Sequence, residues 1–286
     1  MAQTIQLPDG RSLELHESGD PEGFPVIFHH GTPGAGLTYP AWSTPGVRLV
    51  GYDRAGYGGS TRAPGRRIAS VAADVLAIAD ALELDRFATW GISGGGPHAL
   101  ACGALCGDRV TAVASLAGIA PYPAEGLDWL AGMGQDNVDE FALTLEGEEA
   151  SRPSAERNRE EMLAATPEEI FAVFDSLLGD ADRAALTGEL AAFMHEGTAH
   201  GLAHGVDGWL DDDLAFVQPW GFELDAIACP VLVVQGGDDR FVPRAHGEWL
   251  AAHLPGAEAW IDDENGHLTL ATTSVAKVHE WLLRHS

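Results

Sequence analysis

The stretch Phe87-Ala88-Thr89-Trp90-Gly91-Ile92-Ser93-Gly94-Gly95-Gly96-Pro97-His98-Ala99-Leu100-Ala101-Cys102 decides the fold that we predict for this chain of 286 residues. Its first four residues predict a strand, and residues 97–102 predict a helix. Ser93 therefore lies between glycines at a strand-to-helix turn, which is the context that a nucleophile elbow requires. The backbone approaches itself closely in such a turn, so a side chain at Gly91 or Gly95 would clash. The start of the helix supplies N–H groups that favour negative charge.

Strand and helix patterns alternate on both sides of this turn. Apolar runs predict a hairpin over residues 4–17 and strands over 25–29, 47–52, 86–91, 110–116, 230–235 and 257–261. Helical spacing of apolar residues predicts helices over 68–83, 244–254 and 268–285. This alternation is typical of an α/β fold with a mostly parallel sheet flanked by helices on both faces.

The alternation stops between residues 119 and 222, where helical patches such as 167–178 and 183–195 occur without a buried-strand run. We expect residues 119–222 to form a helical cap domain over one end of the sheet, and residues 1–118 with 223–286 to form the core domain. Some of the cap aromatics should line an apolar pocket. These are Trp129, Phe141, Phe171, Phe174, Phe193, Trp209, Phe216 and Trp220.

Two polar groups in the cap are interpreted as structural. We expect His195, His200 and His204 to lie in a loop between cap helices, because their spacing matches no known metal site. The run Asp211-Asp212-Asp213 is interpreted as a solvated acidic segment that starts a helix, because it lacks the alternating ligands of a calcium loop.

The formal net charge of −27 argues against nucleic acid and anionic membranes as partners. No apolar stretch approaches the roughly 18 residues of a membrane span, and the first residues do not resemble a signal peptide. The three cysteines are interpreted as reduced, so we expect a cytoplasmic protein. We expect its partner to be a small-molecule substrate, and a homo-oligomer is possible.

Residues 119–222 hold 22 of the 43 acidic residues. This excess indicates a solvated surface or an entrance that tolerates cationic substrates.

A serine hydroxyl needs a base within hydrogen-bond reach and an acid that orients this base. Asp238 and Asp239 follow the predicted strand at 230–235, and His267 follows the strand at 257–261. Both segments should end at the sheet edge where open parallel sheets build their sites. The order serine, aspartate, histidine predicts a triad of Ser93, Asp239 and His267, with Asp238 as the competing acid. No metal or organic cofactor is implied.

Acyl transfer also needs hydrogen-bond donors for the oxyanion. The loop His29-His30-Gly31-Thr32-Pro33-Gly34 follows the strand at 25–29, and we assign one donor to the backbone N–H of Thr32. The second donor is the N–H of Gly94, directly after the candidate nucleophile. Pro33 has no N–H and cannot donate. The alternative for this loop is a plain glycine turn.

Together these residues resemble the α/β-hydrolase superfamily. The resemblance rests on residues 30–34, the elbow, Asp239, His267 and the segment Asp53-Arg54-Ala55-Gly56-Tyr57-Gly58-Gly59-Ser60, and it covers the chain apart from the cap. It implies an α/β-hydrolase fold, with Asp53 and Arg54 in structural roles. Residues 30–34 and 53–60 are also similar to proline iminopeptidases, although Gly94 and Thr32 replace the tryptophan and glycine typical of that group. Cofactor-free haloperoxidases and carbon–carbon hydrolases share the same three residue types.

We therefore expect a serine hydrolase that cleaves small, fairly apolar carboxylic esters through an acyl-enzyme on Ser93. One alternative is an aminopeptidase similar to proline iminopeptidases, in which cap carboxylates bind the substrate amine. The other is a ligand-binding or non-hydrolytic relative with a vestigial triad.

Overall fold

The computed structural model describes residues 2–169 and 174–286. Eight strands form one sheet in the order β1-β2-β4-β3-β5-β6-β7-β8. The strands are β1 (Ala2–Gln6), β2 (Ser12–Gly19), β3 (Phe24–His29), β4 (Val47–Tyr52), β5 (Phe87–Ile92), β6 (Val110–Leu116), β7 (Val231–Gly236) and β8 (Glu258–Asp262). The strands from β4 to β8 pair in parallel, whereas the β1–β2 hairpin adds an antiparallel edge. The predicted α/β fold with a mostly parallel sheet is confirmed.

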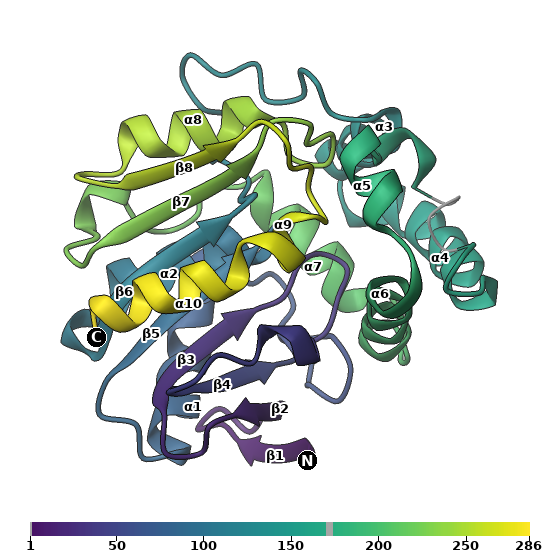
Figure 1. Cartoon of the computed structure of the whole chain (residues 1–286). Coiled ribbons are helices and arrows are strands. Elements are labelled where there is room, and N and C mark those ends of the chain that lie inside the picture. Colours follow the sequence, from purple (N-terminus) through teal and green to yellow (C-terminus); the bar gives the residue numbers. More distant parts are fainter. Residues whose placement is uncertain (1, 170–173) are drawn as a thin grey trace.

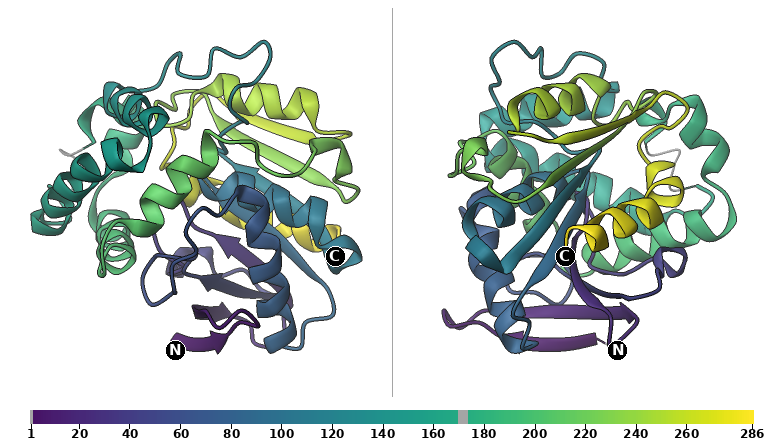
Figure 2. Two further views of the ribbon diagram at one scale, coloured as in Figure 1. Left: turned by 180° about the vertical axis from the view of Figure 1, so that it is seen from behind. Right: turned by 60° about the vertical axis from the view of Figure 1, so that its left-hand side comes forward.

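Helices cover both faces of the sheet (Figures 1 and 2). Alternate side chains of each strand point to opposite faces, so Ile27 of β3 packs in one core cluster while Val26 and Phe28 pack in the other. The first cluster includes residues of α1 (Val71–Ala81), α2 (Gly95–Leu105) and α8 (Arg244–His253). The second includes residues of α10 (Val275–Arg284). The elbow at the end of β5 is thus held between two apolar layers.

The chain between β6 and β7, residues 117–230, is called the insertion below. Its described residues contain helices and no strand. The α-helices are α3 (Gln135–Glu146), α4 (Glu148–Ala164), α5 (Asp180–Ala185), α6 (Gly188–Gly201) and α7 (Asp207–Phe216). Helices α3 to α6 gather beyond the carboxyl ends of the parallel strands (Figure 1). The domain boundaries at 119 and 222 stay a prediction.

Three helices differ from their predicted extents. The helix expected over 183–195 is divided between α5 and α6, because Gly188 has a φ of +56° that a continuous right-handed helix does not allow. Consequently His195 and His200 lie on α6, and their expected position in a loop is wrong. The closing helix is also divided, into α9 (Leu270–Thr273) and α10. The helix expected over 167–178 lies partly outside the described residues, as does the predicted pocket residue Phe171.

No helix among the described residues is long and apolar enough to cross a membrane. Cys102, Cys106 and Cys229 are free thiols, so the cysteines form no disulfide framework.

Candidate active site

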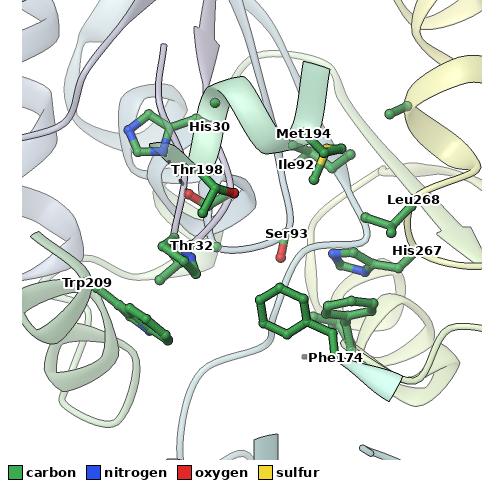
Figure 3. A pocket seen from close by; sticks show the side chains of 18 of the residues that line it. His30, Thr32, Ile92, Ser93, Phe174, Met194, Thr198, Trp209, His267 and Leu268 are labelled. Carbon is green, nitrogen blue, oxygen red and sulfur yellow. Dashed lines mark hydrogen bonds between the residues drawn. The ribbon is translucent and has the colours of Figure 1, made fainter. Parts of the chain in front are cut away.

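Ser93 lies at the turn between β5 and α2 with a φ of +56°, a conformation that non-glycine residues rarely adopt. A Cβ at Gly91 would collide with the carbonyl of Gly95, and a Cβ at Gly95 would collide with the carbonyl of His29. The turn is therefore closed on two sides by backbone, as the sequence predicted. The N–H of Ser93 donates to the carbonyl of Leu116 on β6 over 2.8 Å. The hydroxyl of Ser93 points into a cavity (Figure 3).

Asp239 and His267 form a buried pair at the carboxyl ends of β7 and β8. His267 Nδ1 lies 2.8 Å from Asp239 Oδ2, and Asp239 Oδ1 accepts the backbone N–H groups of Phe241 and Val242 at 2.9 and 2.8 Å. Burial lowers the pKa of His267, but the charge of Asp239 and the hydrogen bond to it outweigh burial and leave that pKa above its ordinary value. The ring of Phe241 stacks on the imidazole with centroids 4.6 Å apart.

The side chain of Asp238, the competing acid, does not contact His267. Its carboxylate accepts the N–H of Ala181 at 3.3 Å and lies 4.0 Å from the Arg240 guanidinium, and its side chain is 34% exposed. Of the two adjacent acids, Asp239 is the one that contacts His267. Both residues follow β7 in a turn, where Asp239 is held by the N–H groups of Phe241 and Val242 and Asp238 faces the N–H of Ala181.

The loop that carries His267 is held by a residue that sequence reasoning missed. Asp182 of α5 is fully buried and accepts the backbone N–H groups of His267, Leu268 and Thr269 at 2.8, 2.8 and 3.0 Å. Burial raises the pKa of this carboxyl despite these hydrogen bonds. Asp182 is 85 residues from His267 in the chain, so no local pattern could have linked them.

Thr32 and Gly94 lie against each other beside Ser93. A Cβ at Gly94 would collide with the hydroxyl of Thr32, and a Cβ at Gly31 would lie 3.4 Å from Cβ of Ser93. Within the described chain, the N–H groups of Thr32 and Gly94 have no protein acceptor. Because both residues line the same cavity as Ser93, these two N–H groups are available to a ligand there.

A buried ion cluster fixes the loop of Thr32. Asp212 of α7 accepts hydrogen bonds from the hydroxyls of Thr32 and Tyr57 at 2.7 and 2.8 Å and lies 2.6 Å from Arg54 Nη2. Arg66 Nη1 also lies 2.6 Å from Asp212. Burial alone would raise the pKa of Asp212, but the charges of Arg54 and Arg66 hold it well below its ordinary value.

Arg54 extends this cluster to the backbone of the loop. Its guanidinium donates to the carbonyl of His30 and, over 3.0 Å, to the carbonyl of Gly31. A helix of the insertion thus determines the position of the segment that follows β3. The segment is more than the plain glycine turn that was the alternative.

The expectation that Asp211, Asp212 and Asp213 form a solvated run is wrong. All three are at most 3% exposed, and they lie inside α7, which begins at Asp207. The reason is charge compensation by arginines distant in sequence: Arg62 binds Asp211 at 2.9 Å, while Arg54 and Arg66 bind Asp212. A single sequence does not show which arginines face which carboxylates.

The cavity next to Ser93 has a volume of about 180 Å³. Ser93, Thr32, Gly94 and His267 all line it, and its remaining walls are mostly apolar (Figure 3). The apolar lining includes Phe141, Phe174, Phe193, Met194, Trp209, Phe216 and Phe241. Five of the predicted cap aromatics are therefore found here, whereas Trp129 and Trp220 pack into the first core cluster.

Two carboxylates interrupt the apolar wall. Glu140 of α3 and Asp213 of α7 both line the cavity and are paired with each other. Burial raises the pKa of each, and the charge of Glu140 raises that of Asp213 well above its ordinary value. Trp209 Nε1–H donates to Glu140 over 2.6 Å. Each of these two carboxyl groups therefore holds its proton more tightly than an exposed carboxyl group does.

The hydroxyl of Ser93 has no hydrogen bond to any described residue in this structure. Ser93 and His267 face the same cavity (Figure 3). Nδ1 of His267 is bonded to Asp239, and Nε2 has no hydrogen-bond partner among the described residues. Catalytic hydrogen bonds are often long in ligand-free enzymes and shorten when substrate binds. A serine hydroxyl, an imidazole and two backbone N–H groups without a protein acceptor therefore belong to residues that line one cavity.

Comparison with known proteins identifies the family. The sequence model described as the alpha/beta hydrolase fold matches residues 25–272. The chain belongs to this family. A non-heme chloroperoxidase from Streptomyces lividans is 26% identical over 261 residues, which are 88% of this chain and 87% of that protein. A hydrolase of 2-hydroxy-6-oxononadienedioate and 2-hydroxy-6-oxononatrienedioate from Paraburkholderia phymatum is 27% identical over 278 residues, 91% of this chain and 87% of that enzyme.

A solved structure gives the same fold. The esterase of Exiguobacterium antarcticum superposes with a TM-score of 0.71 at 18% identity and covers 99% of this chain and 100% of its own. This likeness shows the fold of the chain and leaves its activity open. Membership of the alpha/beta hydrolase family supports enzyme status.

The ion cluster leads to a stability prediction. Thr32→Val keeps the shape of the side chain but removes the hydroxyl that donates to the buried Asp212 carboxylate. We expect the free energy of unfolding to fall by about 1–3 kcal/mol, the usual range for a hydrogen bond to a charged group. Urea unfolding at pH 7 measures this. Thr32→Ser, which keeps the hydroxyl, should lose less, and equal losses in both variants would contradict the assignment.

Proposed function

We propose that this protein is a serine hydrolase that cleaves small, fairly apolar carboxylic esters through an acyl-enzyme on Ser93. One observation carries the proposal: the Ser93 hydroxyl at a strained elbow and the His267–Asp239 pair open onto one apolar cavity. An activated alcohol beside a small apolar cavity suits an uncharged acyl group. Membership of the alpha/beta hydrolase family supports hydrolysis in general.

In the proposed reaction, Ser93 Oγ attacks the ester carbonyl carbon while Nε2 of His267 accepts the hydroxyl proton. Asp239 keeps the other ring proton on Nδ1 and stabilises the imidazolium. The N–H groups of Thr32 and Gly94 donate to the oxyanion of the tetrahedral intermediate. His267 then returns the proton to the departing alcohol, and water, activated by the same imidazole, releases the carboxylic acid.

The cavity supports the substrate class. A volume of about 180 Å³ is small compared with drug-sized ligand pockets, which are roughly 300–1,000 Å³. The walls are aromatic and aliphatic side chains of the insertion together with Phe241. A short acyl chain fits these dimensions, whereas an anionic substrate meets the negative charge of Glu140 and Asp213.

The Glu140–Asp213 pair favours a second candidate, an aminopeptidase similar to proline iminopeptidases. Neither carboxylate forms a salt bridge with a described residue. A buried negative charge without a cationic partner can bind a substrate ammonium group in the cavity. Under this alternative the same Ser93 chemistry acts on the amide that follows an N-terminal residue.

A non-hydrolytic, ligand-binding relative is the third candidate. The reactivity of the Ser93 hydroxyl distinguishes this candidate from the two enzymatic candidates. Stoichiometric labelling of the wild type by a serine-directed fluorophosphonate requires an activated hydroxyl, so an unlabelled protein would favour this candidate.

The nucleophile assignment predicts a large loss of activity in Ser93→Ala. We expect kcat for a short-chain nitrophenyl ester to fall roughly 10⁴- to 10⁶-fold, as in other triad deletions. The assay compares acetate, butyrate and octanoate esters, and the wild type should prefer the shorter chains. Ester turnover in Ser93→Ala close to that of the wild type would refute Ser93 as nucleophile.

The pKa of His267 predicts the pH profile. The imidazole accepts a proton only when it is neutral, so kcat/KM should fall as the pH drops through its pKa. Because Asp239 raises this pKa, we expect the midpoint above the ordinary value of 6.5. Asp238→Asn serves as the matched control and should leave the profile unchanged. A flat profile between pH 5 and 8 would argue against His267 as the base.

Glu140→Gln separates the ester and amine candidates. Glutamine keeps an acceptor for Trp209 but removes the negative charge from the cavity wall. If esters are the substrates, kcat/KM for a neutral nitrophenyl ester should change less than about threefold. If an amine is bound, KM for an N-terminal proline amide should rise at least roughly tenfold, the equivalent of one charge-assisted contact. Measuring both substrates with both proteins decides between them.

A further inference from the structure

Two histidines and two carboxylates converge outside the cavity, where the β1–β2 hairpin meets the end of α6. Glu14 and His16 are two residues apart on β2 and therefore share one face of the strand. Asp53 follows β4, and His200 is the second-last residue of α6. The donor atoms of Glu14, His16 and His200 lie within 4.8 Å of one another.

Asp53 lies at the centre of this cluster. Its Oδ1 is 3.3 Å from Nε2 of His16, and its Oδ2 is 2.9 Å from Nε2 of His200. Nε2 of His200 is also 4.0 Å from Glu14 Oε2. A Cβ at Gly58 would collide with the Asp53 carboxylate and with Nε2 of His200, so these two groups can meet only because residue 58 has no side chain.

One residue of this cluster is fully buried, and the other three are partly accessible to solvent. The Asp53 side chain is fully buried, whereas those of His16, Glu14 and His200 are 11%, 19% and 31% exposed. A hydrated ion can therefore reach the imidazoles from solvent. The partly exposed side chains can adjust their rotamers without disturbing the core.

We propose that Glu14, His16, Asp53 and His200 form a binding site for a divalent transition-metal ion of the zinc type. Two imidazole nitrogens select such ions over Mg²⁺ and Ca²⁺, which prefer oxygen ligands. Nε2 of His16 and Nε2 of His200 lie 3.3 and 2.9 Å from the two different oxygens of Asp53, so this carboxylate faces both imidazoles that would bind the ion. Each imidazole then binds the ion through Nε2 and carries its proton on Nδ1.

The location gives the ion a structural effect. Phe193, Met194 and Thr198 of α6 line the cavity, and His200 lies two residues beyond Thr198. The carbonyl of Gly201 already accepts the N–H of Gly58 at 3.0 Å, so the end of α6 rests on the segment after β4. A metal ion bound by His200, His16 and Asp53 would link α6, which lines the cavity, to β2 and to the segment after β4.

Zinc titration of the full-length, chelator-treated protein tests the site. Calorimetry at pH 7.5 should show one high-affinity Zn²⁺ in the wild type. His16→Gln and His200→Gln should each weaken this affinity at least about tenfold, because even the loss of an outer-shell partner costs 10- to 100-fold. His253→Gln, on the exposed surface of α8, is the matched control and should bind like the wild type. Saturating Zn²⁺ should raise the Tm of the wild type and this control more than that of the two cluster variants.

Absence of Zn²⁺ binding in the wild type, or wild-type affinity in either cluster variant, would overturn the proposal. Circular dichroism without metal establishes that the variants fold. Should they not fold, X-ray absorption of the zinc-loaded wild type replaces them, and fewer than two imidazole ligands would refute the site. Ser93→Ala should bind Zn²⁺ normally, so this result does not depend on the proposed hydrolysis.

Discussion

Backbone crowding around Ser93 is the constraint on which the rest of the site depends. Gly91 and Gly95 have no space for a side chain, because the carbonyls of Gly95 and His29 occupy it. The left-handed conformation of Ser93 costs on the order of 1–3 kcal/mol, which the packed sheet must offset. The same contact fixes the end of β3 against the start of α2. The segment carrying Thr32 therefore begins at a defined place beside the serine.

The insertion holds the other loops of the candidate site in place around Ser93. Two buried carboxylates reach from it to the loops around Ser93: Asp182 binds three N–H groups of the His267 loop, and Asp212 binds Thr32 and Arg54. Each stabilises a loop that strand geometry alone leaves free. The arrangement also couples the cavity wall to the candidate oxyanion donors, since α7 contributes both Asp212 and the pocket residues Trp209 and Phe216.

The sequence predicts the parts of the site that follow strand ends, because a strand places the next residue at a known edge of the sheet. Ser93, Asp239 and His267 are of this kind. Asp182 and Asp212 are different. Their partners are 85 and 180 residues away, and both acids lie in segments whose composition suggests a solvated surface. Burial of an acid depends on which donors the fold brings to it, and this information is not local in the chain.

The acidic residues behind the net charge of −27 include two kinds of buried carboxylate, which differ in whether other groups compensate their charge. Asp212, Asp182 and Asp239 are buried but compensated, by arginines, by backbone N–H groups, or by N–H groups with an imidazole. Glu140 and Asp213 are partnered mainly by each other, and burial shifts the pKa of both upward. A pair of this kind costs stability unless a ligand or a shared proton neutralises it. We propose that this pair, which lines an otherwise apolar cavity, contacts the substrate, either as a hydrogen-bond donor to a neutral ester or as an anion facing an amine.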